Sequence, residues 1–230
     1  MQDLHKLSEE LKLLSAQEGL ELLAKQFASE ITFSTSFGLE DQVITEMIAQ
    51  KQLNIKIFTL DTGRVFQEIY ELADSTKAKY QLPIKTYYPS TEQIEELTSK
   101  KGFNSFYQSV ENRKECCFIR KVVPLKRALK NNKIWITGLR AEQSENREKM
   151  PILEYDENFD IIKFNPLINW TQKDIDNYTE ENNIPTSSLR QKGYISIGCS
   201  PCTRPIQVGE HPRAGRWWWE TSHKECGLHS

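Results

Sequence analysis

The sequence predicts an α/β protein with a doubly wound, mainly parallel sheet. Short runs of β-branched and aromatic residues alternate along the chain with longer segments of helical periodicity. The turns that follow several of these runs are rich in Ser, Thr, Gly and Asp, as is typical of the sheet edge at which open α/β folds bind ligands. Strands and helices that alternate in this way indicate a parallel sheet covered by helices.

The segments follow one another in a regular order. The expected strands are residues 31–36, 54–60, 83–88, 133–138, 153–155 and 160–164. The expected helices are residues 3–14, 17–29, a segment that carries Val43, Ile44 and Met47, and then 65–78, 91–100, 114–130 and 171–182. Thr171 is a typical N-cap for the last helix. Cys116 and Cys117 are expected to open or precede the helix at 114–130.

The composition is that of an ordinary globular protein, with 230 residues, 38% hydrophobic and 27% charged, and a formal net charge of −2. The lack of a basic excess argues against non-specific binding to nucleic acid. No apolar run approaches the ~20 residues of a membrane span, and residues 1–17 lack the apolar core of a signal peptide. We therefore expect a cytoplasmic protein, in which clustered cysteines bind metal or do chemistry more often than they form structural disulfides.

The turn after the first predicted strand is a candidate anion site. Ser34, Thr35 and Ser36 supply hydroxyl donors, and Gly38 allows close approach of the backbone to a ligand. A helix N-terminus follows, where amide groups and the helix dipole favour negative charge. An ordinary turn capped by Ser or Thr explains the segment equally well. It is not a Walker A loop, because it has no Gly-Lys-Ser/Thr.

Two further strand ends carry candidate ligand-binding residues. The second strand runs into Asp61-Thr62-Gly63, and Asp61 is suited to contacts with ribose or adenine; its alternative role is to cap the following helix. After the fourth strand, Gly138 is followed by Arg140 and Arg147. Two arginines past a strand end suit a dianion, because guanidinium groups pair with phosphate in a bidentate manner. A solvated charged loop is the alternative.

The five cysteines are the most informative residues. Cys199 and Cys202 form a Cys-Xaa-Xaa-Cys pair, which can bind a metal or form a redox disulfide. Cys116 and Cys117 are adjacent, and adjacent thiols rarely bond to each other because the disulfide would be strained. Two small buried hydrophobic side chains are the alternative there, although the Arg-Lys pair that follows would stabilise thiolates. Cys226 is left over. We interpret the set as four ligands and one nucleophile.

Several separated blocks carry a family resemblance. They are STSFGLEDQ, LDTG with Phe66 and Glu68, ECCFIRKVVPL, TGLRAEQS with Arg147, KFNPLINWT, GYISIGCSPCTRP, RAGRWWWE and KECGLH. From about Phe33 to His229 the chain resembles the assimilatory adenylylsulfate reductases, a branch of the sulfonucleotide (APS/PAPS) reductases. Residues 1–30 match only as generic helices.

The resemblance implies a fold of the adenine-nucleotide α-hydrolase type, related to the PP-loop pyrophosphatases. It suggests N-terminal helices over residues 1–30 that pack on the core, and a nucleotide-binding α/β domain over residues 31–192. Residues 193–230 would form a cluster-binding segment and catalytic tail within the same domain. A homo-oligomer is compatible with the resemblance, which implies neither nucleic acid nor membrane as a partner.

The resemblance also implies a cofactor and a reaction. Cys116, Cys117, Cys199 and Cys202 would hold one 4Fe–4S cluster, which requires four cysteine thiolates. Cys226 would attack the sulfur of adenosine 5′-phosphosulfate (APS), expel AMP and become an S-sulfonate. Thioredoxin or a glutaredoxin-like dithiol would then release sulfite.

The expected site residues follow from this chemistry, because an anionic nucleophile that attacks an anionic substrate needs cations around it. The expected catalytic residues are Cys226, Lys121, Arg213 and Arg216. The expected substrate-binding residues are Ser34, Thr35, Ser36, Phe37, Gly38, Asp41, Asp61, Thr62, Gly63, Gly138, Arg140 and Arg147. Residues 217–219, three tryptophans, are expected to anchor the base of the tail to the core or a neighbouring subunit; a docking surface for thioredoxin is the alternative.

Three alternative functions remain open. An ATP-dependent PP-loop enzyme would carry Ser-Gly-Gly-Lys-Asp-Ser, whereas residues 36–41 read SFGLED. A zinc-binding interaction protein would use the four cysteines but leave Cys226 and the arginines idle. The phosphoadenylylsulfate (PAPS) reductases are a sister group that usually lacks both cysteine pairs. The acidic residues Glu40, Asp41 and Asp61 favour the substrate without a 3′-phosphate, with PAPS or dual specificity as the alternative.

Overall fold

The computed structural model describes residues 2–144 and 147–220, and it confirms the predicted α/β class. Its sheet has the strand order β3-β2-β1-β4-β6-β5. The strands are β1 Ile31–Ser34, β2 Lys56–Leu60, β3 Ile84–Tyr87, β4 Ile134–Ile136, β5 Leu153–Asp156 and β6 Ile161–Phe164. β1 pairs in parallel with β2 and with β4, β4 pairs in parallel with β6, and β5 is antiparallel to β6. All six strands expected from the sequence are present.

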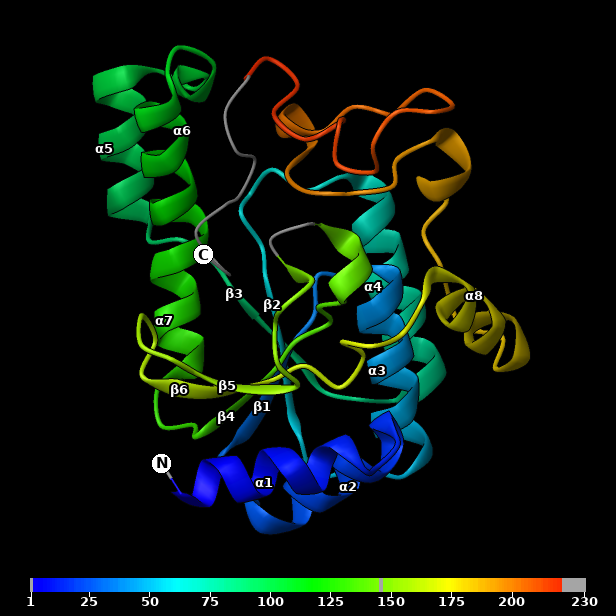
Figure 1. Cartoon of the computed structure of the whole chain (residues 1–230). Helices are drawn as coiled ribbons and strands as arrows, with labels where there is room; N and C mark the ends of the chain where they lie inside the picture. Colours follow the sequence, from blue (N-terminus) through cyan, green and yellow to red (C-terminus); the bar gives the residue numbers. More distant parts are fainter. Residues whose placement is uncertain (1, 145–146, 221–230) are drawn as a thin grey trace. The chain divides into compact units, whose positions relative to one another are not determined.

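The helices alternate with these strands along the chain (Figure 1). They are α1 Gln2–Lys12, α2 Ala16–Gln26, α3 Leu39–Gln50, α4 Gln67–Tyr80, α5 Thr91–Lys101, α6 Val110–Cys117, α7 Val123–Leu129 and α8 Gln172–Glu181. Thr171 caps α8 as predicted, in a reciprocal capping box with Asp174. No helix within the described ranges has the length and apolar character needed to cross a membrane.

The chain divides into two compact units, each discontinuous in sequence. The first consists of Met1–Thr59, Leu72–Lys85 and Leu129–Thr186. The second consists of Leu60–Glu71, Thr86–Ala128 and Ser187–Ser230. The division into residues 1–30, 31–192 and 193–230 remains a prediction.

The core of the first unit is built on β1 and β4. Ile31, Phe33, Ile134 and Ile136 are fully buried, and Thr32 of β1 and Trp135 of β4 are buried on the opposite face. Strands of a parallel sheet covered on both faces have this pattern, because neither face meets water. α2 packs closely on β6, where a Cβ at Gly19 would lie 3.0 Å from the ring of Phe164.

The direction of chain progression reverses between β1 and β4. β2 and β3 extend the sheet on one side of β1, and β4, β6 and β5 extend it on the other. In open α/β sheets, ligands bind beyond the carboxyl ends of the strands at this reversal. The turns that follow β1 and β4 both belong to the first unit and are therefore its candidate ligand-binding edge.

The helix predicted at 114–130 is the clearest correction. Ser109 caps α6, which begins at Val110, so Cys116 and Cys117 close this helix rather than open or precede one. A π-helical turn, Phe118–Val122, follows, and α7 begins at Val123. Pro124 lies in the first turn of α7, where its missing amide hydrogen costs no helical hydrogen bond. Periodicity alone did not reveal the interruption, because the apolar spacing continues through it.

Candidate active site

The turn after β1 is held by its own side chains. Ser36 donates to Asp41 Oδ2 from its backbone nitrogen at 2.6 Å and from its hydroxyl at 2.7 Å. The amide of Phe37 donates to the hydroxyl of Thr35 at 3.0 Å. The hydroxyl of Ser34 accepts from the indole nitrogen of Trp135 at 2.8 Å. Several donors expected to face an anion therefore have partners within the first unit.

Asp41 fits into a space that only a glycine at position 138 leaves open. A Cβ on Gly138 would lie 2.2 Å from Asp41 Oδ1 and 3.3 Å from the Cβ of Glu40. Burial raises the pKa of Asp41 to about 6, and the neighbouring Glu40 contributes, although the hydrogen bonds from Ser36 oppose the change. The turns after β1 and β4 are thus tied together through this carboxylate.

Arg140 is buried in a polar network within the first unit. Its Nε lies 2.9 Å from Glu40 Oε1 and its Nη1 lies 3.0 Å from Glu142 Oε2. Nη2 donates to Gln172 Oε1 at 2.7 Å. Arg147, also buried, donates from Nη1 to Gln143. Most of the guanidinium donors of Arg140 are used inside the protein, so a ligand would compete with existing partners.

The Asp61 loop belongs to the second unit. Asp61 does not cap α4, which begins at Gln67; its carboxylate accepts from the amide of Gly63 at 2.7 Å and from the hydroxyl of Tyr70 at 2.9 Å. Gly63 has φ = 70°, a conformation that favours glycine. The hydroxyl of Thr62 lies 3.2 Å from Cys199 Sγ. Residues expected to bind nucleotide therefore also contact the cysteine segment.

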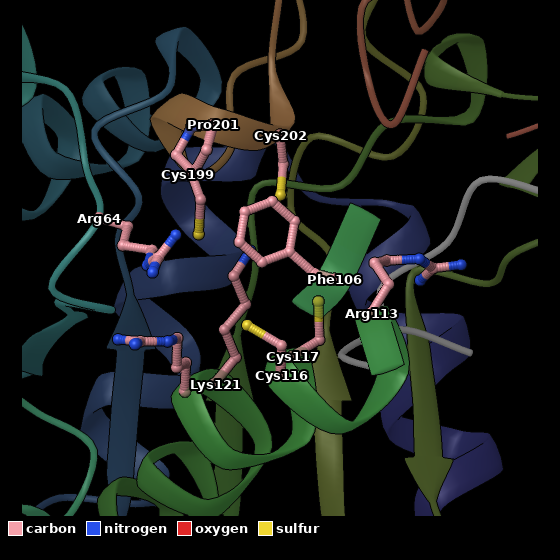
Figure 2. A pocket seen from close by; sticks show the side chains of 10 residues that line it. Arg64, Phe106, Arg113, Cys116, Cys117, Lys121, Cys199, Pro201 and Cys202 are labelled. Carbon is pink, nitrogen blue, oxygen red and sulfur yellow. The ribbon is translucent and has the colours of Figure 1, made fainter. Parts of the chain in front are cut away.

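Four cysteine side chains line one pocket of the second unit. Cys116 and Cys117 come from the end of α6, and Cys199 and Cys202 come from the turn at Ser200–Cys202. Figure 2 shows the two pairs facing each other, with their sulfur atoms pointing into a common space. The pocket encloses about 310 Å³ not occupied by atoms, part of it open to solvent.

Hydrogen bonds fix the turn that presents Cys199 and Cys202. The amide of Cys202 donates to the carbonyl of Cys199 at 2.9 Å. The buried hydroxyl of Thr203 donates to the same carbonyl at 3.0 Å and accepts from the amide of Gly198 at 3.1 Å. The hydroxyl of Tyr107 donates to the carbonyl of Pro201 at 2.6 Å. Tyr107 was not anticipated from the sequence, because a single hydroxyl gives no pattern.

The cations that line the pocket come from the Asp61 loop, from α6 and from the π-helical turn, and they are Arg64, Arg113, Arg120 and Lys121. Arg120 donates from Nη1 to the carbonyl of Thr62 at 2.6 Å. Burial raises the pKa of Cys202 to about 12, reinforced by Cys199 and Cys117, while Lys121 opposes the change. Burial also raises the pKa of Cys116, and Arg120 opposes it. A bound metal would remove these protons, because the thiolate is the ligand.

The four cysteines are the donor set that a 4Fe–4S cluster would require. Within residues 2–144 and 147–220, no three Cys, His, Asp or Glu side chains are grouped closely enough for one metal ion. In a 4Fe–4S cluster each cysteine binds a different iron, so four sulfurs need only surround the cluster. Four cysteine sulfurs directed into one pocket satisfy that requirement.

Arg216 is a buried cation at the end of the described chain. Its side chain is 7% exposed, its Nε has no hydrogen-bond partner, and its Nη1 makes one long bond, 3.3 Å, to the carbonyl of Ile197. It forms no ion pair with a carboxylate of the described residues. Its guanidinium carbon lies 4.5 Å from the ring centre of Trp217, and a Cβ at Gly198 would come within 2.6 Å of it.

The remaining predicted residues can be placed as follows. Arg213 is half-buried, and its carbonyl accepts from the amide of Arg216 at 3.0 Å. Trp217 is fully buried, Trp219 packs on Tyr107 with ring centres 4.5 Å apart, and Trp218 is exposed. Cys226, the expected nucleophile, lies outside the described residues.

The comparisons identify the family. The model of the phosphoadenosine phosphosulfate reductase domain matches residues 30–205. The chain belongs to this family. A protein of Agrobacterium fabrum named adenosine 5′-phosphosulfate reductase is 48% identical to it over 86% of this chain and 76% of its own. A protein of the same name from Allochromatium vinosum is 47% identical over 86% of this chain and 78% of its own.

Solved structures agree with the family assignment. The crystal structure of phosphoadenylyl-sulfate (PAPS) reductase from Candida auris, in complex with phosphate, has a TM-score of 0.74 and 32% identity, and the match covers 87% of this chain and 96% of that chain. An FMN adenylyltransferase of Candida glabrata has a TM-score of 0.56 at 16% identity, covering 97% and 76% of the two chains. The second similarity supports the predicted PP-loop type of fold alone.

Proposed function

We propose that this member of the family reduces adenosine 5′-phosphosulfate to sulfite and AMP in the assimilation of sulfate. The observation that carries the proposal is the pocket with four cysteines, in a chain of this family. Two relatives that are 47% and 48% identical are named adenosine 5′-phosphosulfate reductase, whereas the PAPS reductase of known structure is 32% identical.

The reaction takes place in two steps at Cys226. In the first, the Cys226 thiolate attacks the sulfate sulfur; an S–S bond forms, the bond between sulfur and the phosphate oxygen breaks, and AMP leaves with that electron pair. In the second, a thiolate of a thioredoxin-like or glutaredoxin-like dithiol attacks Cys226 Sγ, and sulfite leaves with the electrons of the S–S bond. The second thiol of the partner then closes its disulfide and regenerates the Cys226 thiol.

Cations make the first step feasible, because a thiolate and an anionic substrate repel each other. We assign this role to Arg216, Arg213 and Lys121. The argument is strongest for Arg216, which is buried without a carboxylate partner among the described residues. A buried charge without a partner is costly, and an anionic substrate would supply the missing counter-charge.

Nucleotide binding is assigned to the residues that follow the strands. In the first unit these residues are Ser34, Thr35, Ser36, Phe37, Gly38, Asp41, Gly138, Arg140 and Arg147. In the second unit Asp61, Thr62 and Gly63 are assigned separately, on the resemblance of the LDTG block. Asp41 and Arg140 serve chiefly to hold the turns, given their internal partners.

We assign one 4Fe–4S cluster to Cys116, Cys117, Cys199 and Cys202. When bound, the cluster would link α6 to the turn at Ser200–Cys202 and set the local charge beside Lys121. We also propose a cytoplasmic location, where a reduced thioredoxin pool is available to complete the reaction. Assembly into a homo-oligomer stays a prediction.

The test of this function is a single turnover without reductant. Protein purified without air should contain iron and sulfide, and addition of adenosine 5′-phosphosulfate should place one sulfonate on Cys226, as read by mass spectrometry, with release of one AMP. Cys226→Ser should keep its iron and bind nucleotide but form no adduct, because a serine hydroxyl is hardly ionised near neutral pH. An adduct on another cysteine, or zinc in place of iron, would contradict the proposal.

A further inference from the structure

The segment that precedes the last ten residues is fastened to α6 by one buried ion pair. Arg113, on α6, and Glu220 form two parallel contacts, Nε to Oε1 and Nη2 to Oε2, each 2.9 Å long. Their side chains are 1% and 5% exposed. Bidentate pairs of this kind are strong and directional, particularly when water is excluded.

Arg113 also supports the indole of Trp217. Its guanidinium carbon lies 4.5 Å from the ring centre, the same distance as that of Arg216. Trp217 has φ = 40°, a backbone conformation that side-chain-bearing residues rarely adopt. Such a conformation persists only where surrounding contacts hold it. Here the amide of Trp217 donates to the carbonyl of Cys202 at 3.1 Å, and the amide of Glu220 donates to the carbonyl of Trp217 at 2.9 Å.

The turn Trp217–Glu220 is therefore held at its start and at its end. Cys226 follows Glu220 by six residues, and a chain of this length spans at most ~20 Å. If Glu220 is fixed, the Cys226 thiol stays within this distance of it. If the turn is released, more residues separate the thiol from the nearest fixed residue, and the effective concentration of the thiol at the substrate falls. Effective concentration falls as a tether lengthens, and the rate of an intramolecular attack falls with it.

We propose that Arg113 is a positioning residue for Cys226: through Glu220 and Trp217 it fixes the point from which the last ten residues extend. This inference rests on the proposed function for its catalytic consequence, but the anchoring itself does not. Arg113 would act through Glu220 and would not touch the substrate. The ion pair thus turns a C-terminal segment into a short tether.

The test compares Glu220→Gln with a matched control, Glu210→Gln. Glu210 forms an equally bidentate pair with Arg204, at 2.8 and 2.9 Å, in the same C-terminal segment but more exposed. In the wild type the peptide bond after Arg216 lies between two buried residues. We expect trypsin to cut there about tenfold faster or more in Glu220→Gln, because local opening exposes the bond, and at the wild-type rate in Glu210→Gln.

The second readout is the rate of Cys226 sulfonation in one turnover at saturating substrate. It should fall about tenfold or more in Glu220→Gln at unchanged iron content, and stay at the wild-type value in Glu210→Gln. Glu220→Asp keeps the charge on a shorter side chain and should restore part of both properties. Unchanged cleavage after Arg216 would overturn the anchor, and faster cleavage with an unchanged sulfonation rate would overturn the positioning role. If the wild type forms no adduct, the proposed function fails and the cleavage rates alone decide the anchor.

Discussion

At the scale of single residues, two of the three charged residues expected to bind the ligand in the first unit are engaged in structure. Arg140 pairs with Glu40 and Gln172, and Asp41 accepts two hydrogen bonds from Ser36. By contrast, Arg216 is buried with an unsatisfied Nε. Arg140 thus holds a turn in the first unit, whereas Arg216 carries a buried charge that no carboxylate of the described residues pairs with. The difference lies in the partners that the tertiary structure supplies to each arginine.

The raised pKa of Asp41 predicts that the stability of the protein depends on pH. Its pKa is about 6 in the folded protein, mainly through burial, and about 3.9 in an unfolded chain. Between these values the folded state binds the proton more tightly, so this residue makes the protein less stable as pH rises from about 4 to about 6. Urea unfolding should show that Asp41→Asn removes roughly 1 to 3 kcal/mol of this decrease.

The relevant quantity is the difference in unfolding free energy between wild type and Asp41→Asn at pH 4.5 and pH 7.5. The variant should gain relative to the wild type at the higher pH, because the wild type then carries a buried charge. Asp174→Asn, at the exposed capping box of α8, is the control: hydrogen bonds from Thr171 lower the pKa of Asp174, so its pH dependence falls below about pH 4 and its difference from the wild type should be the same at both pH values. Parallel profiles for wild type and Asp41→Asn would show that Asp41 is not protonated in this range.

At the scale of elements, α6 connects the cysteine pocket with the end of the described chain. It carries Arg113 one turn before Cys117, so one helix face presents both the anchor of Glu220 and a proposed cluster ligand. The π-helical turn that follows presents Arg120 and Lys121 to the same pocket. Such turns are common at functional sites, because they shift the face that side chains present.

The N-cap of α6 should therefore matter for the cluster. Ser109 Oγ accepts from the amide of Asn112 at 3.1 Å, and Ser109→Ala should cost about 1 kcal/mol of unfolding free energy. Because α6 ends in Cys116 and Cys117, fraying of the helix should also speed the loss of iron to a chelator. Ser90→Ala is the control: Ser90 caps α5 in the same way, with Gln93 at 3.2 Å, and should lower stability by a similar amount without faster iron loss. Equal rates of iron loss in the two variants would show that the N-cap of α6 does not affect retention of the cluster.

At the scale of the whole molecule, the choice of nucleotide tests the function. A 3′-phosphate adds about two negative charges, and binding it requires cations. The cation of the Asp61 loop is already engaged, because Arg64 donates to Phe103 and to Asn104 and lies over the ring of Phe106. The relatives named adenosine 5′-phosphosulfate reductase are also more similar than the PAPS reductase of known structure.

We expect kcat/KM to be clearly higher for adenosine 5′-phosphosulfate than for its 3′-phosphorylated form, measured as sulfite release with thioredoxin. Asp61→Asn should narrow the difference, because it removes a negative charge that would repel the 3′-phosphate. An equal or higher value for the 3′-phosphorylated form would indicate a PAPS or dual-specificity enzyme, and it would leave the chemistry at Cys226 intact.

The sequence by itself determined the order of strands and helices and the membership of the cysteine set. Short runs of β-branched and aromatic residues such as ITF and IWI are typical of buried strands, so all six strands were predictable. The spacing of Cys116, Cys117, Cys199 and Cys202 has chemical meaning before folding, and the structure places all four around one pocket. Each of the two cysteine pairs is a local pattern, so it can be recognised before the fold is known.

Tertiary structure alone decided which charges are satisfied. Arg140 pairs with Glu142, two residues away, but the partner of its Nε is Glu40, which lies 100 residues before it in the sequence. The pair of Arg113 and Glu220 joins positions 107 residues apart; Glu220 closes the RAGRWWWE block, but nothing local indicates that its partner is Arg113. The break between α6 and α7 was likewise invisible, because helical periodicity continues through a π-helical turn. Long-range electrostatics and packing are set by the fold, and no window of sequence contains both partners.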